Sequence, residues 1–348
     1  MSAILETELP GTINTAAAWY GKALQDDDSW IELLSVAERE ELLAAVAHVN
    51  ANSTTMLGMK REDFPLPTLA PRLSRLSREL VDGRGFWLLR GLPLERMTER
   101  DAAFAYWGIG LHLGMPVSQN ARGHLLGHVT DEGVEFKRNN GARGYQTRLH
   151  LPFHTDSSRA VGLLCLQPAK SGGASSVAST TSVYNEVLRR RPDLAYLWFA
   201  DWLFDRRNEE QPGEAPFYRT RLAHWDGQHL AVRYVRPFLE SAQRHDAVPP
   251  HTTEQTEFLD LVDEIANEPG VALKMDFRPG DMQFISNDKT FHSRTAYEDY
   301  DDPERKRHLL RLWLALHGGR PMPPDFGRSG GTVKAVPGTS EAMAGTYV

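Results

Sequence analysis

A histidine and an aspartate stand two positions apart in the segment 151–156, LPFHTD, as His154 and Asp156. In an extended chain, residues i and i+2 point to the same side, so both side chains can reach one metal ion. His292, far downstream, is a candidate third ligand. Two imidazoles and one carboxylate on one face of an octahedral iron(II) leave three coordination positions open for other ligands. The pattern therefore favours a mononuclear iron site, although an HxD pair alone is a weak signal.

Other histidines are weaker candidates for metal binding. His124 and His128 have the i, i+4 spacing of a helical zinc motif, but LLG lies between them and the glutamate of an HExxH motif is missing. His308 follows Arg307 directly, so in a strand its side chain points to the opposite face. We expect these three histidines to be structural.

Composition narrows the classes of partner. The 348 residues carry a net charge of -7, which argues against nucleic acid and favours a small-molecule substrate. Cys165 is the single cysteine, so disulfides and cysteine-built metal sites are excluded and a reducing compartment fits. No apolar run is long enough to cross a membrane, and the N-terminus lacks a basic and an apolar signal region. We therefore expect a cytoplasmic protein without a membrane partner, and a homo-oligomer remains open.

The elements that position the candidate ligands alternate between helices and buried strands. Ser35 and Glu38 predict a capped helix, and further helices are expected over 72–81 and from Thr252 to about 265. The apolar runs 86–89, 163–166 and 309–316 predict buried strands, the last with its arginines and Trp313 at odd positions. Asp226-Gly227 suits a hairpin turn within 219–235, and 272–286 predicts a strand, a turn and a strand.

These elements predict an α+β protein with a mostly β core of the jelly-roll type. We expect an N-terminal helical region over 1–82 that packs on the core, a β-rich core with a helical insert over 83–320, and an irregular tail over 321–348. No strand-linked GxGxxG or GxxxxGK[ST] motif is present, so a nucleotide-binding fold is not favoured.

Five stretches together resemble the taurine dioxygenase (TauD/TfdA) family, in the order expected for that family: residues 84–92, 151–156, 171–175, 277–281 and 292–311. The resemblance implies a double-stranded β-helix, a distorted jelly roll of the clavaminate synthase type with flanking helices. It also implies a non-haem iron(II) dioxygenase that consumes 2-oxoglutarate and O2, releases succinate and CO2, and oxidises a C–H bond. The implied metal ligands are His154, Asp156 and His292.

The resemblance also implies roles for residues that bind the co-substrate. Arg307 occupies the place of an arginine that binds the distal carboxylate of 2-oxoglutarate, a task for which a planar, bidentate donor is suited. Ser175 occupies the place of a threonine that touches the same carboxylate. Arg311 corresponds to an arginine that binds an anionic group of the prime substrate in several members. The competing interpretations are a solvated charge run for Arg307, an ordinary loop serine for Ser175, and a structural ion pair for Arg311.

Residues that should border the metal site, with lower priority, are Gln119, Asn120, Tyr145, Arg148 and Arg159. Hydroxylation of a small, anionic substrate is the favoured reaction, and desaturation or ring formation at the same iron centre are alternatives. A halogenase would lack the carboxylate ligand, and Asp156 is present. A non-catalytic, cupin-like binding protein is the alternative from another class. The residues do not identify the prime substrate.

Overall fold

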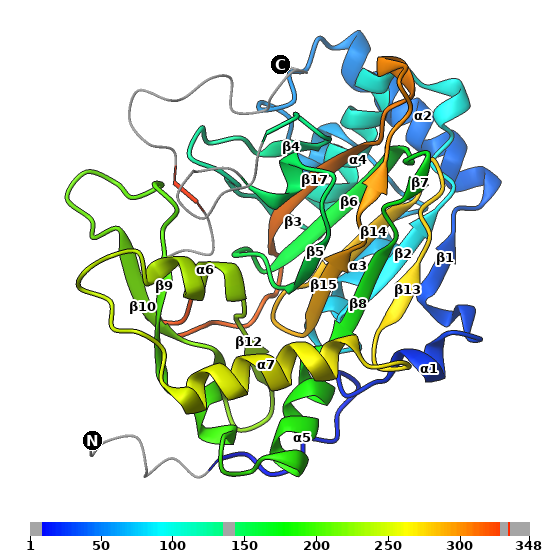
Figure 1. Ribbon diagram of the computed structural model, residues 1–348. Coiled ribbons are helices and arrows are strands. Elements are labelled where there is room, and N and C mark those ends of the chain that lie inside the picture. The colour runs from blue at the N-terminus through cyan, green and yellow to red at the C-terminus, as the bar shows by residue number, and fades with distance from the viewer. Residues whose placement is uncertain (1–8, 135–142, 328–332, 335–348) are drawn as a thin grey trace.

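Two β-sheets form the centre of the computed structural model, which describes residues 9–134, 143–327 and 333–334 (Figure 1). The larger sheet has seven strands, in the order β1 (Ile31–Leu33), β2 (Phe86–Arg90), β14 (Met282–Ser286), β6 (Ala160–Gln167), β17 (His308–Leu316) and β3 (Gly114–Pro116), with β4 (Leu126–Val129) also on β17. The smaller sheet has the order β13 (Leu273–Met275), β8 (Ser175–Ser179), β15 (Thr290–Arg294) and β5 (Leu151–His154). Apart from the parallel β1–β2 pair, neighbouring strands in both sheets are antiparallel.

Alternation along the strands divides the apolar side chains between two cores. Phe86 and Leu88 of β2 pack between the sheets with Trp313 of β17 and with Val177 of β8. Their neighbours on β2, Trp87 and Leu89, belong instead to a second core on the outer face of the larger sheet. Two sheets that enclose one core and carry helices outside confirm the expected double-stranded β-helix.

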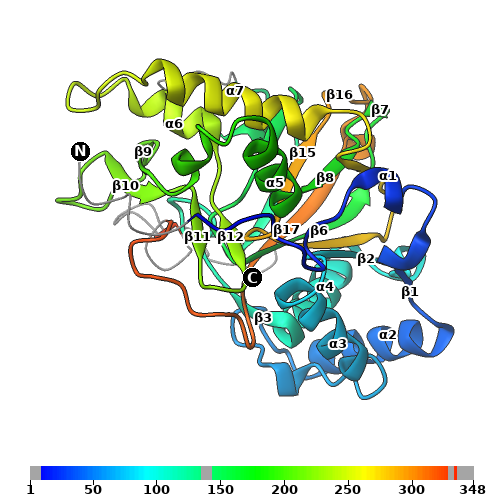
Figure 2. The same cartoon turned by 90° about the horizontal axis from the view of Figure 1, so that it is seen from below.

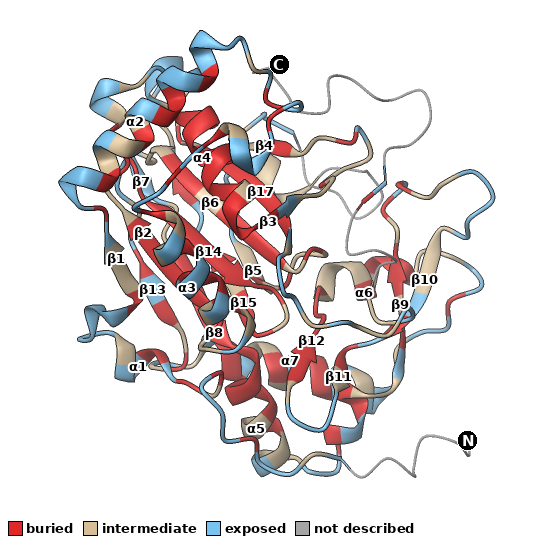
Figure 3. Cartoon of the chain, turned by 180° about the vertical axis from the view of Figure 1, so that it is seen from behind, coloured by how far each residue is buried: buried red, intermediate tan, exposed pale blue. Residues whose placement is uncertain are grey.

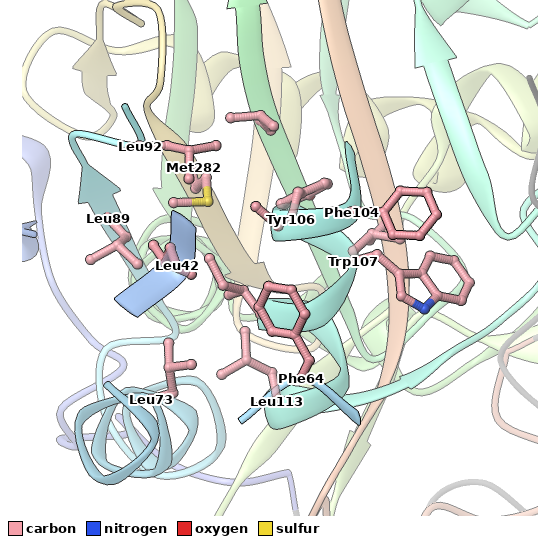
Figure 4. Close-up of a cluster of buried hydrophobic side chains, with 14 of the residues drawn as sticks. Leu42, Phe64, Leu73, Leu89, Leu92, Phe104, Tyr106, Trp107, Leu113 and Met282 are labelled. Atoms are coloured by element: carbon pink, nitrogen blue, oxygen red, sulfur yellow. The ribbon is translucent and has the colours of Figure 1, made fainter. Parts of the chain in front are cut away.

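Three helices cover the outer face of the larger sheet: α2 (Val36–Ala51), α3 (Ala70–Val81) and α4 (Glu99–Leu113) (Figure 2). Figure 4 shows part of this core, where Leu42 of α2, Leu73 of α3 and Tyr106 of α4 lie near Leu89 and Met282 of the sheet. At the start of α2, the Ser35 hydroxyl accepts a hydrogen bond from the Glu38 amide at 3.2 Å, and the Glu38 carboxylate accepts one from the Ser35 amide at 2.8 Å. This capping box confirms the helix start expected from the sequence.

The other side of the molecule is built from the long segment between β8 and β13. Helices α5 (Thr180–Arg190) and α7 (Thr253–Asn267) pack against each other and contribute to an apolar cluster that includes Phe153 of β5 and Phe291 of β15. The same segment holds α6 (Arg236–Ala242) and the antiparallel pairs β9 (Asp201–Asp205) with β10 (Phe217–Arg221), and β11 (Ala223–Trp225) with β12 (Leu230–Val232). The short elements α1 (Gly21–Leu24), β7 (Ser171–Gly172) and β16 (Tyr297–Glu298) complete the described elements other than 3-10 turns.

The turn 278–281 moves the chain from one sheet to the other, since β13 pairs with β8 and β14 pairs with β2 and β6. Gly280 has φ +83°, and a Cβ atom there would lie 2.4 Å from the Leu92 carbonyl oxygen. The Asp281 carboxylate accepts hydrogen bonds from the Arg90 guanidinium, at 2.9 and 2.8 Å, and from the Arg278 amide. The expected strand, turn and strand are therefore present, but the two strands lie in different sheets.

The expected helices and buried strands are present, and the hairpin around Asp226-Gly227 is formed by β11 and β12. The three-part division of the chain stays a prediction, and the first part also contributes β1 to the larger sheet. Buried residues concentrate in the two sheets and on the helix faces against them (Figure 3). Within the described ranges, no helix is long and apolar enough to cross a membrane. Most of the expected tail lies outside the described residues.

Candidate active site

His154, Asp156 and His292 converge at one edge of the smaller sheet. His154 is the last residue of β5, His292 lies at the centre of β15, and the antiparallel pairing places these two histidines directly opposite each other. Nε2 of His154 lies 4.0 Å from Asp156 Oδ1, and Nε2 of His292 lies 3.8 Å from Asp156 Oδ2. The candidate ligand atoms of the three residues all lie within 4.8 Å of one another. The structure thus brings the HxD pair and the distal histidine together.

Both imidazoles are held in the neutral form that a metal requires. Burial is the main cause that lowers the pKa of His154. Burial, and then the nearby His154, lowers the pKa of His292 to about 3. Nδ1 of His154 lies 2.8 Å from the Pro152 carbonyl oxygen, which can only accept a hydrogen bond, so Nδ1 carries the hydrogen. This contact selects the tautomer in which Nε2 of His154 keeps its lone pair for a metal.

Asp156 is held in the ionised form by its neighbours. Burial alone would raise the pKa of this carboxyl group, but the Arg311 guanidinium, the two imidazoles once they are protonated at low pH, and a Trp313 hydrogen bond outweigh burial and lower it to about 2. The Trp313 indole donates that bond to Oδ2 at 2.9 Å, and Nη1 of Arg311 lies 3.8 Å from the same oxygen. Neutral nitrogen donors and an anionic oxygen donor fit a divalent transition metal such as iron(II).

The backbone between and after the two ligands in the HxD segment is fixed from two directions. Nη1 of Arg233 donates to the Thr155 carbonyl oxygen at 2.7 Å, and its Nη2 donates to the Ser157 hydroxyl at 3.0 Å. The side-chain oxygen of Asn287 accepts a hydrogen bond from the Asp156 amide at 2.9 Å. Neither Arg233 nor Asn287 was singled out from the sequence, because no local motif marks a residue that binds a distant backbone.

A cavity of about 200 Å³ opens beside the three residues. Its walls include the aromatic side chains of Tyr145, Phe238 and Trp313. Asp156 is the one acidic residue that lines it in the described part of the chain, against five arginines: Arg143, Arg233, Arg294, Arg307 and Arg311. This excess of buried positive charge suits anionic ligands.

Arg307 lies just before β17 and borders the cavity with only 4% of its surface exposed. Its Nη1 is buried and has no hydrogen-bond partner among the described residues. Its guanidinium carbon lies 5.0 Å from the centre of the Tyr297 ring, and burial lowers its pKa. An unpartnered, buried guanidinium nitrogen is costly unless a ligand supplies an acceptor.

Arg294 was missed by sequence analysis, although it stands two residues after His292. Its guanidinium carbon also lies near Tyr297, 4.8 Å from the ring centre, and its Nη2 donates to the Thr147 carbonyl oxygen at 2.7 Å. Nε and Nη1 of Arg294 have no partner in the described residues. Ser175 also borders the cavity, and its hydroxyl lies 3.5 Å from the Gln283 side-chain oxygen.

Arg311 faces the cavity from β17, on the inner face of the larger sheet. Its Nε donates to the Gln119 side-chain oxygen at 2.8 Å, and its guanidinium carbon lies 4.4 Å from the Tyr145 ring centre. Arg311 is paired with Gly127 of β4, where a Cβ atom would lie 2.7 Å from that Gln119 oxygen. A glycine at position 127 therefore leaves the space from which Gln119 orients the Arg311 guanidinium.

The remaining sequence candidates lie away from the metal ligands. Nδ1 of His128 is 2.8 Å from Nε2 of His308, so these two histidines contact each other, and His128 lies on a strand rather than a helix. Arg159 forms an ion pair with Asp288 at 2.9 Å. Arg148 does not line the cavity, and Asn120 contacts His124 at 3.3 Å. The interpretation of these histidines as structural is consistent with their positions.

Comparison with known proteins places this geometry among oxygenases. Residues 51–313 match the family described as "Taurine catabolism dioxygenase TauD, TfdA family". The FR-33289 synthase of Streptomyces rubellomurinus (strain ATCC 31215) is 34% identical over 313 residues, which cover 89% of this chain and 92% of that protein. The taurine hydroxylase-like protein SAT17 of Stachybotrys chartarum (strain CBS 109288 / IBT 7711) is 33% identical over 313 residues, 88% of this chain and 80% of that protein.

Solved structures share the fold at lower sequence identity. Asparagine oxygenase in complex with Fe(II), 2S,3S-3-hydroxyasparagine and succinate matches with a TM-score of 0.63 at 17% identity, over 82% of this chain and 93% of that chain. The non-haem iron oxygenase OrfP in complex with Fe and alpha-ketoglutaric acid matches with a TM-score of 0.57 at 16% identity, with the same 82% of this chain and 93% of that chain covered.

Proposed function

The chain belongs to the TauD/TfdA family of dioxygenases, and we propose that it hydroxylates a small, anionic substrate at an iron centre held by His154, Asp156 and His292. The single observation that carries this assignment is the convergence of two neutral imidazoles and one ionised carboxylate beside a cavity. Bound iron(II) supplies the redox chemistry that couples conversion of 2-oxoglutarate and O2 to succinate and CO2 with oxidation of a substrate C–H bond.

The residues around the three ligands prepare them for the metal. Trp313 and Arg311 occupy the side of Asp156 Oδ2, and the Pro152 carbonyl group fixes the tautomer of His154. Such outer contacts orient ligands before the metal arrives, so that binding needs little rearrangement. Because Arg233 and Asn287 restrain the backbone on both sides of Asp156, the spacing of the HxD ligands is maintained.

Arg307 binds the distal carboxylate of 2-oxoglutarate. Its burial and its Nη1, which has no partner among the described residues, support this role, because a bidentate carboxylate would supply the acceptors that the guanidinium lacks. Ser175 adds a hydroxyl donor that also borders the cavity. Arg311 binds an anionic group of the prime substrate, and Gln119 keeps its guanidinium directed toward the cavity.

Hydroxylation is favoured over the other reactions of such centres. Asp156 is in place as a ligand, which opposes a halogenase, since a halide would need that coordination position. The relatives named as a taurine hydroxylase-like protein and an asparagine oxygenase support hydroxylation over desaturation or ring formation. A non-catalytic binding protein is disfavoured because the ligands, their protonation states and a buried cation for the co-substrate are all kept.

Ligand variants test this function directly. We expect His154→Ala, Asp156→Ala and His292→Ala each to abolish stoichiometric iron(II) binding in anaerobic calorimetry and to abolish succinate formation. His128→Ala is the matched control, because this histidine lies outside the cavity lining, and it should bind iron as the parent does. Stoichiometric iron binding by a folded Asp156→Ala protein would overturn the ligand assignment.

A further inference from the structure

The buried charges of the cavity indicate how many negative charges the prime substrate carries, an inference that rests on the proposed function. Three sets of charged groups at the cavity contain equal numbers of positive and negative charges once iron(II) and 2-oxoglutarate are bound. Arg143 forms an ion pair with Glu209. Bound iron(II) would be balanced by the carboxylate of Asp156 and by the carboxylate next to the keto group of 2-oxoglutarate. Arg294 and Arg307 are balanced by Asp299, whose Oδ1 accepts a hydrogen bond from the Arg307 amide at 2.8 Å, and by the distal carboxylate of bound 2-oxoglutarate. Asp131, which also acts on Arg294, lies 3.9 Å from Arg148 and is balanced there.

The positive charges of Arg233 and Arg311 are left without a negative partner in this count. Arg311 approaches only the Asp156 carboxylate, at 3.8 Å, and that charge is already committed to the metal. Arg233 is 5% exposed, and no carboxylate of the described residues lies within 4.0 Å of its guanidinium. Its hydrogen bonds go to a neutral carbonyl group and to hydroxyl groups. Burying an unbalanced cation is costly, so two such cations beside one reaction centre require counter-charges from a ligand.

Both guanidinium groups border the same short segment. Arg311 contacts the carboxylate of Asp156, while Arg233 contacts the residues on either side of it, Thr155 and Ser157. Both also line the cavity that His154, Asp156 and His292 border. Their charges therefore fall on the part of the cavity where a substrate must lie to reach the metal.

We infer that the prime substrate is an organic dianion, whose two negative charges neutralise Arg311 and Arg233. This assigns Arg233 as a second substrate-binding cation. Arg233 comes from the segment between β12 and α6, whereas Arg311 comes from β17. A substrate with one negative charge would leave a buried guanidinium unbalanced, so the site should discriminate by charge even between molecules of equal shape.

A pair of isosteric probes tests the charge alone. Butyl phosphate is a dianion at pH 7.5, because the second pKa of a phosphate monoester is about 6, whereas butyl sulfate is a monoanion of nearly the same shape. Calorimetry of the anaerobic complex with iron(II) and saturating 2-oxoglutarate should give at least roughly tenfold tighter binding of the phosphate, the scale of one charge-assisted contact. Equal binding of phosphate, sulfate and hexanedioate would overturn the inference.

Hexanedioate carries its two charges on separate groups. Tighter binding of hexanedioate than of butyl phosphate would assign two acidic groups to the substrate, and the reverse order would assign one doubly charged group. Either order supports a dianion, provided that the preferred probe binds more tightly than butyl sulfate. Saturating 2-oxoglutarate occupies the co-substrate site, so hexanedioate cannot bind there.

Variants of Arg233 test whether this residue binds the second negative charge of the substrate. Arg233→Gln should bind butyl phosphate and butyl sulfate equally, whereas Arg233→Lys, which retains the charge, should keep the preference. Arg219→Gln is the control, because this arginine is 67% exposed on the β9–β10 hairpin and should behave as the parent. A preference that persists in Arg233→Gln would overturn the role of Arg233.

Failure of the proposed function is distinguishable from failure of this inference. A parent protein that gives no visible absorption band with iron(II) and 2-oxoglutarate contradicts the iron centre itself. A parent protein that gives the normal absorption band but binds the dianionic and monoanionic probes equally contradicts only the inference of a dianionic substrate. The band of Arg233→Gln also reports whether the HxD segment has kept its position. If that variant does not fold, the parent protein and Arg233→Lys still decide, because tighter binding of a dianionic probe than of butyl sulfate must appear in both.

Discussion

Replacing Arg307 by leucine should separate co-substrate binding from metal binding. The Arg307 guanidinium is 4% exposed, and its Nη1 has no partner among the described residues, so the distal carboxylate of 2-oxoglutarate is its expected acceptor. Loss of a hydrogen bond to a charged group costs about 1.5–3 kcal/mol, which corresponds to roughly ten- to hundredfold weaker 2-oxoglutarate binding. Iron(II) affinity should stay close to that of the parent, because Arg307 touches none of the three ligands.

The assay is a titration of the anaerobic iron(II) protein with 2-oxoglutarate, followed by the visible absorption band or by calorimetry. Arg305→Leu is the matched control, since it removes the same charge from an exposed position two residues earlier, where the guanidinium lies over Tyr300. Arg311→Leu should bind 2-oxoglutarate nearly as the parent does and should instead uncouple succinate formation from product. Unchanged affinity in Arg307→Leu, or a loss found only in Arg311→Leu, would refute the assignment of the two arginines.

Three further outcomes follow from contacts near the site and in the sheets. Trp313→Phe removes the hydrogen bond to Asp156 Oδ2, so iron(II) binding measured by calorimetry should weaken about tenfold, while the far-ultraviolet circular dichroism spectrum stays unchanged. An iron(II) affinity equal to that of the parent would show that the indole does not orient the Asp156 carboxylate. Cys165 is fully buried and burial raises its pKa to about 12, so iodoacetamide at pH 8 should modify it only as the protein unfolds, and iron lost before unfolding would contradict its placement. Burial, and then His308, lowers the pKa of His128 to about 4, so the unfolded chain binds a proton at this residue at higher pH than the folded chain does. The free energy of unfolding of the metal-free protein should therefore fall as pH drops from about 6.5 to 4, by at most about 1.4 kcal/mol per pH unit for this group. Chemical denaturation of His128→Asn should show a weaker dependence of this free energy on pH.

Features set by neighbouring residues could be predicted from the sequence. The capping box of Ser35 and Glu38 lies within one turn, and the HxD pair depends only on the period of an extended chain. The odd-numbered face of 309–316 was also visible as a pattern, and in the structure it carries Arg311 and Trp313 toward the cavity. The hydrogen bond from Trp313 to Asp156 was not predicted, because alternation gives a face and not a contact.

Contacts between distant segments could not be predicted in the same way. Gln119 reaches Arg311 across 192 positions, and the contact depends on Gly127 in the neighbouring strand. Arg233 reaches the HxD segment from an insert whose path no local signal specifies. Helix α4 was likewise not predicted, since most of its residues are buried and its apolar side chains show no single face.

The central claim is that His154, Asp156 and His292 form an iron(II) site that binds 2-oxoglutarate. The most direct measurement is anaerobic titration of the purified protein with iron(II) and then 2-oxoglutarate, with the parent and Asp156→Ala compared side by side. The parent should bind one equivalent of iron(II), develop the weak visible band of a 2-oxoacid chelate, and form succinate when O2 is admitted. A parent protein without the band, or an Asp156→Ala protein with the same band and the same succinate yield, would contradict the claim.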